Sequence, residues 1–251
     1  SFVKAGKNDL LIVVYYQGTS TSTYRHGEPG LIFEVTADSR VVCASSEETV
    51  AYKNSAYADG MNIELVTPQL GYSFRYDSER EGEREGEKPA DAVQKTMEIR
   101  PRPIEKLLVE PPVKARLINK GIFFDTAAGT PAQKMQAAAL SVQYLSGGED
   151  LPSESGVKLE AGRRQTGPEP DGIFAVIDLG EESTGFISLD IEVSHACDVY
   201  IAWGEHLADL RVRSYVGGRH FAALYRAHAG RNRFENPFLR CGLRYLQLHV
   251  Y

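Results

Sequence analysis

Histidine and cysteine, the side chains most often used to bind transition metals, are few in this sequence and widely separated. None of the six histidines forms a His-x-His pair, which argues against a cupin-like metal site. The cysteines, Cys43, Cys197 and Cys241, lack Cys-x-x-Cys spacing, and their odd number does not suit a disulfide framework. Cys197 and Cys241 lie within apolar strand patterns and are predicted to be buried. We expect no metal and no cofactor.

Carboxylates are numerous, but a sequence alone cannot pair them in space. Hydrolysis of a glycosidic bond needs two carboxyl groups roughly 5 to 10 Å apart, and the chain offers 34 acidic residues. It has no Gly-x-Ser-x-Gly elbow, no His-Glu-x-x-His motif and no glycine-rich phosphate loop followed by a helix. The sequence therefore names no catalytic residue, and whether the chain is itself an enzyme stays open.

Charge and hydropathy exclude two classes of partner. The formal charge is -6 with a pI near 5.6, and no basic run is present, so we expect no nucleic acid. The longest apolar run, Leu10 to Tyr16, is far shorter than the roughly 20 residues of a membrane helix, so we expect no membrane. The first residues lack the pattern of a secretory signal, and the compartment stays open with the cytoplasm favoured.

Strand patterns dominate the last third of the chain. Residues 185–193 and 197–203 each alternate apolar and polar side chains, and a tight connection at 194–196 predicts that these two strands pair. The last strand, residues 245–251, is expected to place Leu246, Leu248 and Val250 inward and Gln247 and His249 outward.

Weaker strand signals precede these, at residues 10–16, 30–36, 40–44 and 72–76, with a hairpin loop at 37–39. The charged repeat at 79–87 predicts an exposed loop, and the prolines that follow it predict an extended connector. One helix is predicted from a Thr130 cap to a stop at Gly147, with an apolar stripe interpreted as packing.

These elements predict a mainly β fold with two β-sandwich domains of jelly-roll, galactose-binding-like type and one or two short helices. The first sandwich is expected at residues 1–76, truncated at its N-terminus, and the second at 118–251. Residues 77–117 are the charged loop and the proline-rich connector between them.

Three segments of the second half carry a family resemblance. They are the run from Asp178 to Phe186, the group Trp203, Gly204, Glu205 and Leu207, and the group Pro237, Phe238, Gly242, Arg244 and Tyr245. In order and spacing they resemble the β-sandwich domain that precedes the catalytic barrel in the α-L-rhamnosidases of glycoside hydrolase family 78.

The first half is similar to the upstream accessory domain of the same family. The resemblance lies in residues 4–18, 29–52 and 97–107, although Val50 stands where a tryptophan is expected, and Ala223 or Leu224 where an acidic residue is usual. It implies a parent protein that hydrolyses terminal α-L-rhamnosides with inversion, using carboxylates of an (α/α) barrel that this chain lacks. The chain itself is then an inactive accessory region, with the barrel of the same parent as its partner.

Within this resemblance, five residues are candidates for contact with carbohydrate: Trp203, Glu205, Arg211, Arg213 and Tyr215. They lie at a strand end and in the loop after it, where they could face a rhamnose-containing glycan or the barrel. An alternative places Trp203 in the core, in phase with Ile201. Glu205 and Arg244 have a similar alternative, as ion-paired or simply exposed residues.

Two other functions stay open. A stand-alone carbohydrate-binding module would use an aromatic platform, drawn from Tyr15, Tyr16, Tyr52, Tyr57, Tyr245 and Tyr251. A stand-alone enzyme would need a metal site or a carboxylate pair, and the sequence has no motif that indicates either.

Overall fold

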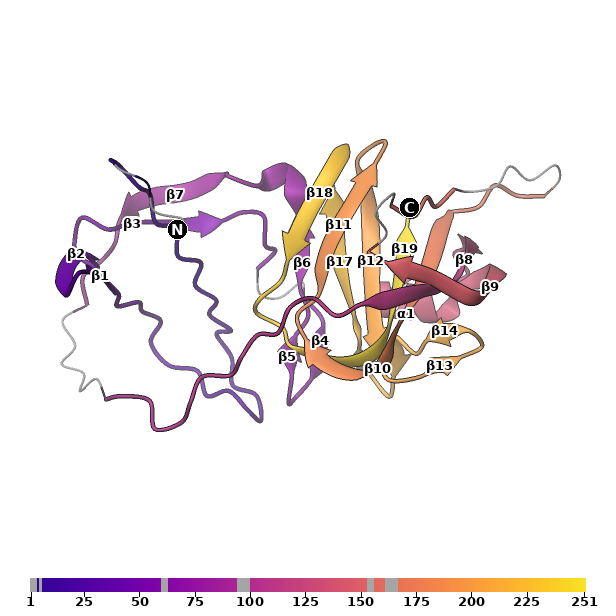
Figure 1. Cartoon of the computed structure of the whole chain (residues 1–251), viewed down its shortest axis with the longest axis horizontal. Coiled ribbons are helices and arrows are strands. Elements are labelled where there is room, and N and C mark those ends of the chain that lie inside the picture. The colour runs from indigo at the N-terminus through magenta and orange to yellow at the C-terminus, as the bar shows by residue number, and fades with distance from the viewer. Residues whose placement is uncertain (1–3, 5, 60–62, 94–99, 153–155, 161–166) are drawn as a thin grey trace.

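The computed structural model describes residues 4, 6–59, 63–93, 100–152, 156–160 and 167–251. It confirms a mainly β fold, with one α-helix and one 3-10 helix among the described residues. Figure 1 shows a sandwich built mostly from the second half of the chain, with the N-terminal strands extending to one side of it.

A seven-stranded sheet forms one layer of the sandwich. Its order is β6 (Arg75–Asp77), β17 (Ala222–Ala227), β12 (Cys197–Gly204), β19 (Cys241–Val250), β10 (Gly172–Gly185), β8 (Ala115–Phe124) and β9 (Ala139–Leu151). Only β6 runs parallel to its neighbour, β17, and the other pairs are antiparallel. Thus a strand from the first third of the chain completes the edge of a sheet made by the rest.

The second layer is a two-stranded sheet of β11 (Ser188–Val193) and β18 (Gly230–Glu235). As predicted, Leu189, Ile191 and Val193 of β11 turn toward the core. The predicted pairing of this strand with residues 197–203 is wrong, because β12 already bonds to β17 on one edge and to β19 on the other. Residues 194–196 therefore cross between layers and do not form a hairpin within one.

Both faces of β19 are covered, which corrects the outward placement of Gln247 and His249. These side chains are 1% and 0% exposed. The His249 ring stacks on Phe123 at 4.2 Å between centroids, and Gln247 accepts a hydrogen bond from the Val212 amide at 2.8 Å. The side chains of β19 alternate between the two faces as predicted, but segments distant in the sequence pack on the polar face and bury it as well.

The helix α1 (Pro131–Ala137) begins as predicted and ends earlier. Thr130 caps it, in a capping box with Gln133. The predicted continuation to Gly147 is wrong because the chain leaves the helix after Ala137 and forms β9, which pairs with the free edge of β8 along nearly its whole length. Met135 and Ala132 of α1 pack on the face of the large sheet that lies opposite the main core.

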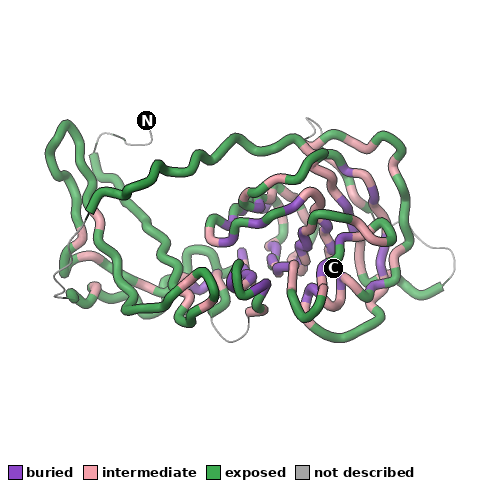
Figure 2. The backbone as a smooth tube through the Cα atoms, turned by 90° about the horizontal axis from the view of Figure 1, so that it is seen from below, coloured by how far each residue is buried: buried purple, intermediate pink, exposed green. Residues whose placement is uncertain are grey.

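Three two-stranded sheets make up the N-terminal region. They are β1 (Glu34–Ala37) with β2 (Arg40–Ala44), β3 (Val50–Asn54) with β7 (Arg84–Pro89), and β4 (Leu65–Thr67) with β5 (Gly71–Tyr72). The β1–β2 turn confirms the predicted hairpin, with Asp38 and Ser39 both at positive φ as a two-residue turn of this type requires. Figure 2 shows the part of this region that includes β1, β2, β3 and β7 almost entirely exposed, whereas β4 and β5 consist mostly of buried residues.

Three predictions for the N-terminal half need correction. The strand predicted at 72–76 is divided, since β5 ends at Tyr72 and β6 begins at Arg75. Residues 10–16 form no strand, since no other described segment pairs with their backbone. The charged repeat at 79–87 is exposed, but its first part belongs to the 3-10 helix η2 (Ser78–Arg80) and its last part to β7, which pairs with β3. Residues 97–99 of the resembling segment 97–107 lie outside the described residues. The division into domains at 1–76, 77–117 and 118–251 stays a prediction.

Four short strands complete the described elements. β13 (Leu207–Ala208) pairs with β14 (Arg211–Val212), and β15 (Tyr215–Val216) pairs with β16 (Arg219–His220). These two small hairpins follow β12 and carry Arg211 and Tyr215, and Arg213 lies between them.

Acid should destabilise the sandwich through His249. Burial, and next the charge of Arg211, lower the pKa of His249 from 6.5 to about 3. The unfolded chain therefore binds a proton between those values that the folded chain does not, so stability is complete above pH 6.5 and falls as the pH decreases. We expect His249 to lower the free energy of unfolding by about 2 kcal/mol at pH 5 relative to pH 7.

Urea unfolding at both pH values, for wild type and His249→Gln, checks this expectation. The wild type should lose more stability than the variant on acidification. An equal loss in the two proteins would contradict it.

Candidate functional site

The five predicted contact residues lie at the end of β12 and on the two small hairpins after it, but they do not share one face. Trp203 belongs to the main core cluster, whereas Ala202 before it packs in the cluster beneath α1. Because successive side chains of a strand point to opposite faces, Trp203 is separated by the sheet from the residues that surround α1.

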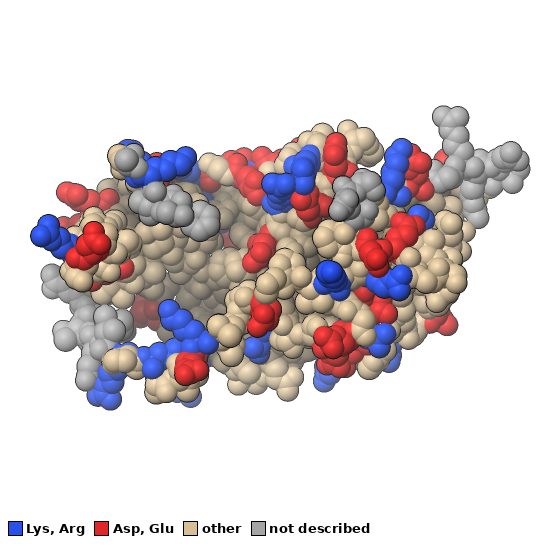
Figure 3. Space-filling view, in the orientation of Figure 1, with Lys and Arg blue, Asp and Glu red and all other residues tan. Residues whose placement is uncertain are grey.

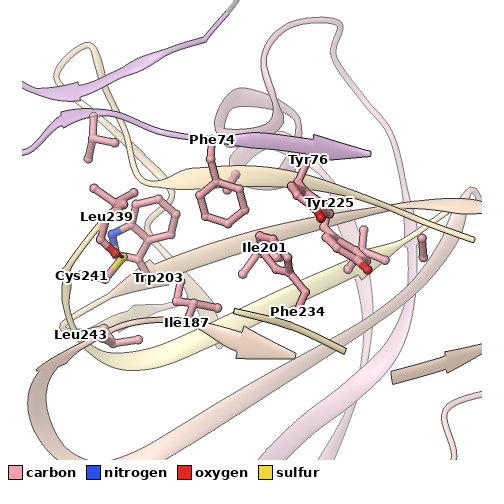
Figure 4. Close-up of a cluster of buried hydrophobic side chains, with 14 of the residues drawn as sticks. Phe74, Tyr76, Ile187, Ile201, Trp203, Tyr225, Phe234, Leu239, Cys241 and Leu243 are labelled. Carbon is pink, nitrogen blue, oxygen red and sulfur yellow. Dashed lines mark hydrogen bonds between the residues drawn. The ribbon is translucent and has the colours of Figure 1, made fainter. Parts of the chain in front are cut away.

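The Trp203 indole is 1% exposed and lies among buried side chains of both layers. Figure 4 shows it beside Leu239 and Cys241, with Ile187 and Leu243 nearby. A sugar could stack on this ring only if the cluster opened. Trp203 therefore lies in the core, as its position on the same face of β12 as Ile201 indicates.

Arg211 is tied to the end of α1. Its Nη1 donates to the carbonyl oxygens of Ala138 at 2.6 Å and Gln136 at 3.2 Å. A cation at this end of a helix satisfies carbonyls that have no partner within the helix, and it matches the helix dipole. The guanidinium of Arg211 therefore has a structural role at the end of α1.

Tyr215 lies on the β15–β16 hairpin beside the start of α1. Its half-buried ring is 5.0 Å from the ring of His220, and Nδ1 of His220 is 3.0 Å from Oγ1 of the helix cap Thr130. Ser214 next to it donates to the Ala132 carbonyl at 2.7 Å. Together with Arg211, this hairpin holds α1 at both ends.

Glu205 and Arg213 are the freely exposed members of the set. Both side chains face solvent, and neither forms an ion pair within the part of the chain that the structure describes. They are available to a ligand or to a docking partner. Contact of these residues with carbohydrate stays a prediction.

An ion pair between Asp178 and Arg244 joins two of the resembling segments. Nε and Nη2 of Arg244 donate to the two carboxylate oxygens at 3.0 and 3.2 Å, and the Gly180 amide donates at 2.7 Å. Burial alone would raise the pKa of Asp178, but these hydrogen bonds outweigh it and lower the pKa. The pair lies where the register of β10 against β19 shifts, after Asp178, so it fixes a bulge. Arg244 is therefore ion-paired, but its partner is Asp178 and not Glu205.

The described residues show no arrangement typical of a metal site or of a reactive thiol. These residues hold no group of three or more His, Cys, Asp or Glu side chains placed to bind a metal ion. Cys197 and Cys241 are buried as predicted, all three cysteines are free, and burial raises the pKa of Cys241 to about 12. No helix in the described ranges is long and apolar enough to cross a membrane.

Comparison with known proteins gives one structural similarity. No protein-family model matches the sequence, and no curated protein matches it. Among solved structures, the GH78 family rhamnosidase of Bacillus sp. GL1 is similar at 24% identity with a TM-score of 0.32. The similarity covers 50% of this chain and 11% of that one.

Removal of the Trp203 side chain should act on folding. Trp203→Ala leaves a large cavity in the main core, so we expect a loss of about 3 to 5 kcal/mol in the free energy of unfolding. Arg213→Ala, at an exposed side chain in the same region, should change it by less than about 0.5 kcal/mol. Chemical denaturation followed by circular dichroism measures both. A Trp203→Ala protein with wild-type stability would contradict a core role.

Proposed function

We propose that this chain is a non-catalytic β-sandwich region of a glycoside hydrolase that resembles the α-L-rhamnosidases of family 78. In this role it packs against the (α/α) barrel of its parent, and its exposed loops contact carbohydrate at the rim of the barrel. The observation that carries the proposal is the uncovered apolar surface of the N-terminal region.

Seven consecutive apolar or aromatic residues, from Leu10 to Tyr16, are each at least 38% exposed. Val41 and Val42 of β2 are 56% and 61% exposed, and Leu31 and Ile32 before β1 are 47% and 64% exposed. Single exposed apolar residues are ordinary, but a contiguous stretch of this kind marks an interaction surface. In Figure 3 the surface between the N-terminal strands and the sandwich is hollowed and consists largely of uncharged residues.

Leu107, Leu108 and Val109 of the connector and Tyr144 of β9 are also 63% to 87% exposed, but the longest run of exposed apolar residues belongs to the N-terminal region. There, an extended apolar segment runs without a strand partner among the described residues. In water such a segment exposes both apolar side chains and unpaired backbone groups, which promotes association. A second folded body would cover it, and the family resemblance suggests the barrel as that body.

The arrangement of the resembling segments also supports the proposal. Gly204 lies directly opposite Tyr245 in the pairing of β12 with β19, and Trp203 lies opposite Leu246. The Asp178–Arg244 pair then connects β10 to the same place. Motifs that are far apart in the sequence thus form one contiguous patch, as expected of residues that define a single structural unit.

The reading frame of the encoding gene tests the proposed role. We expect it to continue beyond the codon for Tyr251 into a long helical barrel with clustered acidic residues. A stop codon directly after Tyr251 would contradict the proposal and would favour the stand-alone carbohydrate-binding module.

The apolar surface should make the isolated chain self-associate. We expect light scattering after size-exclusion chromatography to show oligomers whose mass increases with concentration. Leu11→Glu combined with Val13→Glu places charges in the exposed segment and should shift the population toward monomer. Gln69→Glu, an exposed site outside this segment, is the charge control. Monomeric wild type at high concentration would contradict an uncovered interface.

A further inference from the structure

A pocket of about 210 Å³ lies on strands β8, β9 and β10, at one edge of the seven-stranded sheet. It is lined by Lys120, Gly121, Gln143, Ile173, Phe174 and the segment Lys158 to Glu160. None of these residues is among the five that the sequence suggested. Sequence reasoning missed them because pairing of β8 with β9 was not foreseen.

The strand register explains how the pocket forms. Lys120 lies opposite Gln143 on β9 and opposite Ala175 on β10, so these side chains share a face. Ile173 lies two residues before Ala175 and points the same way. This face continues the core-facing side of the sheet, but none of these four side chains belongs to the main core cluster. The segment 158–160 lies over it and completes the pocket.

Gly121 allows the strands to approach closely at this point. A Cβ atom there would lie 2.0 Å from the Ser141 carbonyl oxygen and 3.0 Å from the Phe174 ring. Only glycine fits between these groups. The strand side of the pocket is therefore built from close pairing of β8 with β9, while the segment 158–160 that completes it lies outside the strands.

The charges around the pocket balance. Lys120 Nζ is 3.1 Å from an oxygen of Glu149, and Lys158 Nζ is 2.6 Å from an oxygen of Glu160. Each ammonium group is thus paired with a carboxylate, although Glu149 itself does not line the pocket. The Lys120 side chain is 23% exposed against 81% for Lys158, so Lys120 is the inner of the two cations.

The lining groups suit hydroxyl groups and an apolar ring face together. The ammonium groups donate hydrogen bonds, the Glu160 carboxylate accepts them and the Gln143 amide does both. Leu159 and Ile173 supply apolar surface. The volume lies below the roughly 300 to 1,000 Å³ of pockets for drug-sized ligands, which limits the occupant to about one ring.

From this combination we infer that the pocket binds a neutral polyhydroxylated ring, a single monosaccharide unit. This site stands on its own geometry, whether or not the chain serves a glycoside hydrolase. It also differs in place from the Glu205 and Arg213 surface, so the two can be tested separately.

Nuclear magnetic resonance titration of the full chain tests the inference. The probes are methyl α-L-rhamnopyranoside and methyl α-D-glucopyranoside, with inorganic phosphate and acetate as charged comparators. We expect saturable shifts with at least one glycoside, and no saturable binding of either anion at the same residues. Affinity should be weak because one ring makes few contacts.

Three variants locate the binding. Lys120→Met keeps the aliphatic stem and removes the ammonium group, and Gln143→Leu removes the amide from an exposed side chain. Each should weaken glycoside binding at least fivefold. Arg116→Met is the matched control, because Arg116 lies on the same strand, pairs with Asp150 at 3.1 Å and lies outside the pocket. It should leave the affinity within twofold of wild type.

Several results would overturn the inference. They are the absence of saturable binding by both glycosides, glycoside binding that Lys120→Met and Gln143→Leu leave unchanged, or tighter binding of phosphate or acetate at these residues. Circular dichroism of each variant ensures that a loss of binding is not a loss of folding. The reading-frame test of the proposed function is independent of all these outcomes.

Discussion

Phe74 and Tyr76, from the first third of the chain, complete a core that the last third builds. The Tyr76 ring stacks on Tyr225 with 3° between the planes and lies 4.4 Å from Phe234. Each such aromatic side chain buries a large apolar area. The parallel pairing of β6 with β17 also covers an edge that would otherwise expose unpaired backbone groups. Ala56 and Val66 in the same cluster, and the Tyr15 ring 5.5 Å from that of Phe238, add to the attachment of the N-terminal region.

A buried polar network fixes the same segment in place. The Ser78 hydroxyl donates to the Arg226 carbonyl at 2.8 Å, and it accepts from the His228 amide at 2.8 Å. Asn232 accepts from the Tyr225 hydroxyl at 3.1 Å and donates to two backbone carbonyls of its own turn. Since an unpaired buried polar group is costly, these partners hold residues 76–78 to one position. The apolar surface of residues 10–16 is then presented by a region fixed at its C-terminal end.

Local patterns in the sequence predicted faces and caps more reliably than neighbours. The alternation of β11 correctly identified its inward residues, and Thr130 correctly marked the start of α1. The partner strand of β11 could not be predicted, because the alternation of side chains shows only which face of a strand is apolar. The burial of His249 depends on Phe123 from another strand, and the pocket beside Lys120 depends on a register set by β9. Such features arise from contacts between distant segments, which no local pattern contains.

The position of the single tryptophan has an optical consequence. Trp203 lies entirely within the sandwich, and the chain has no second indole. Fluorescence excited at the red edge of the protein absorption band therefore comes from the sandwich core alone. Its emission reports whether that core is packed, while it is insensitive to the strands β1, β2, β3 and β7, which lie apart from β12, the strand of Trp203 (Figure 1). Indole emission thus follows the sandwich core separately from these N-terminal strands.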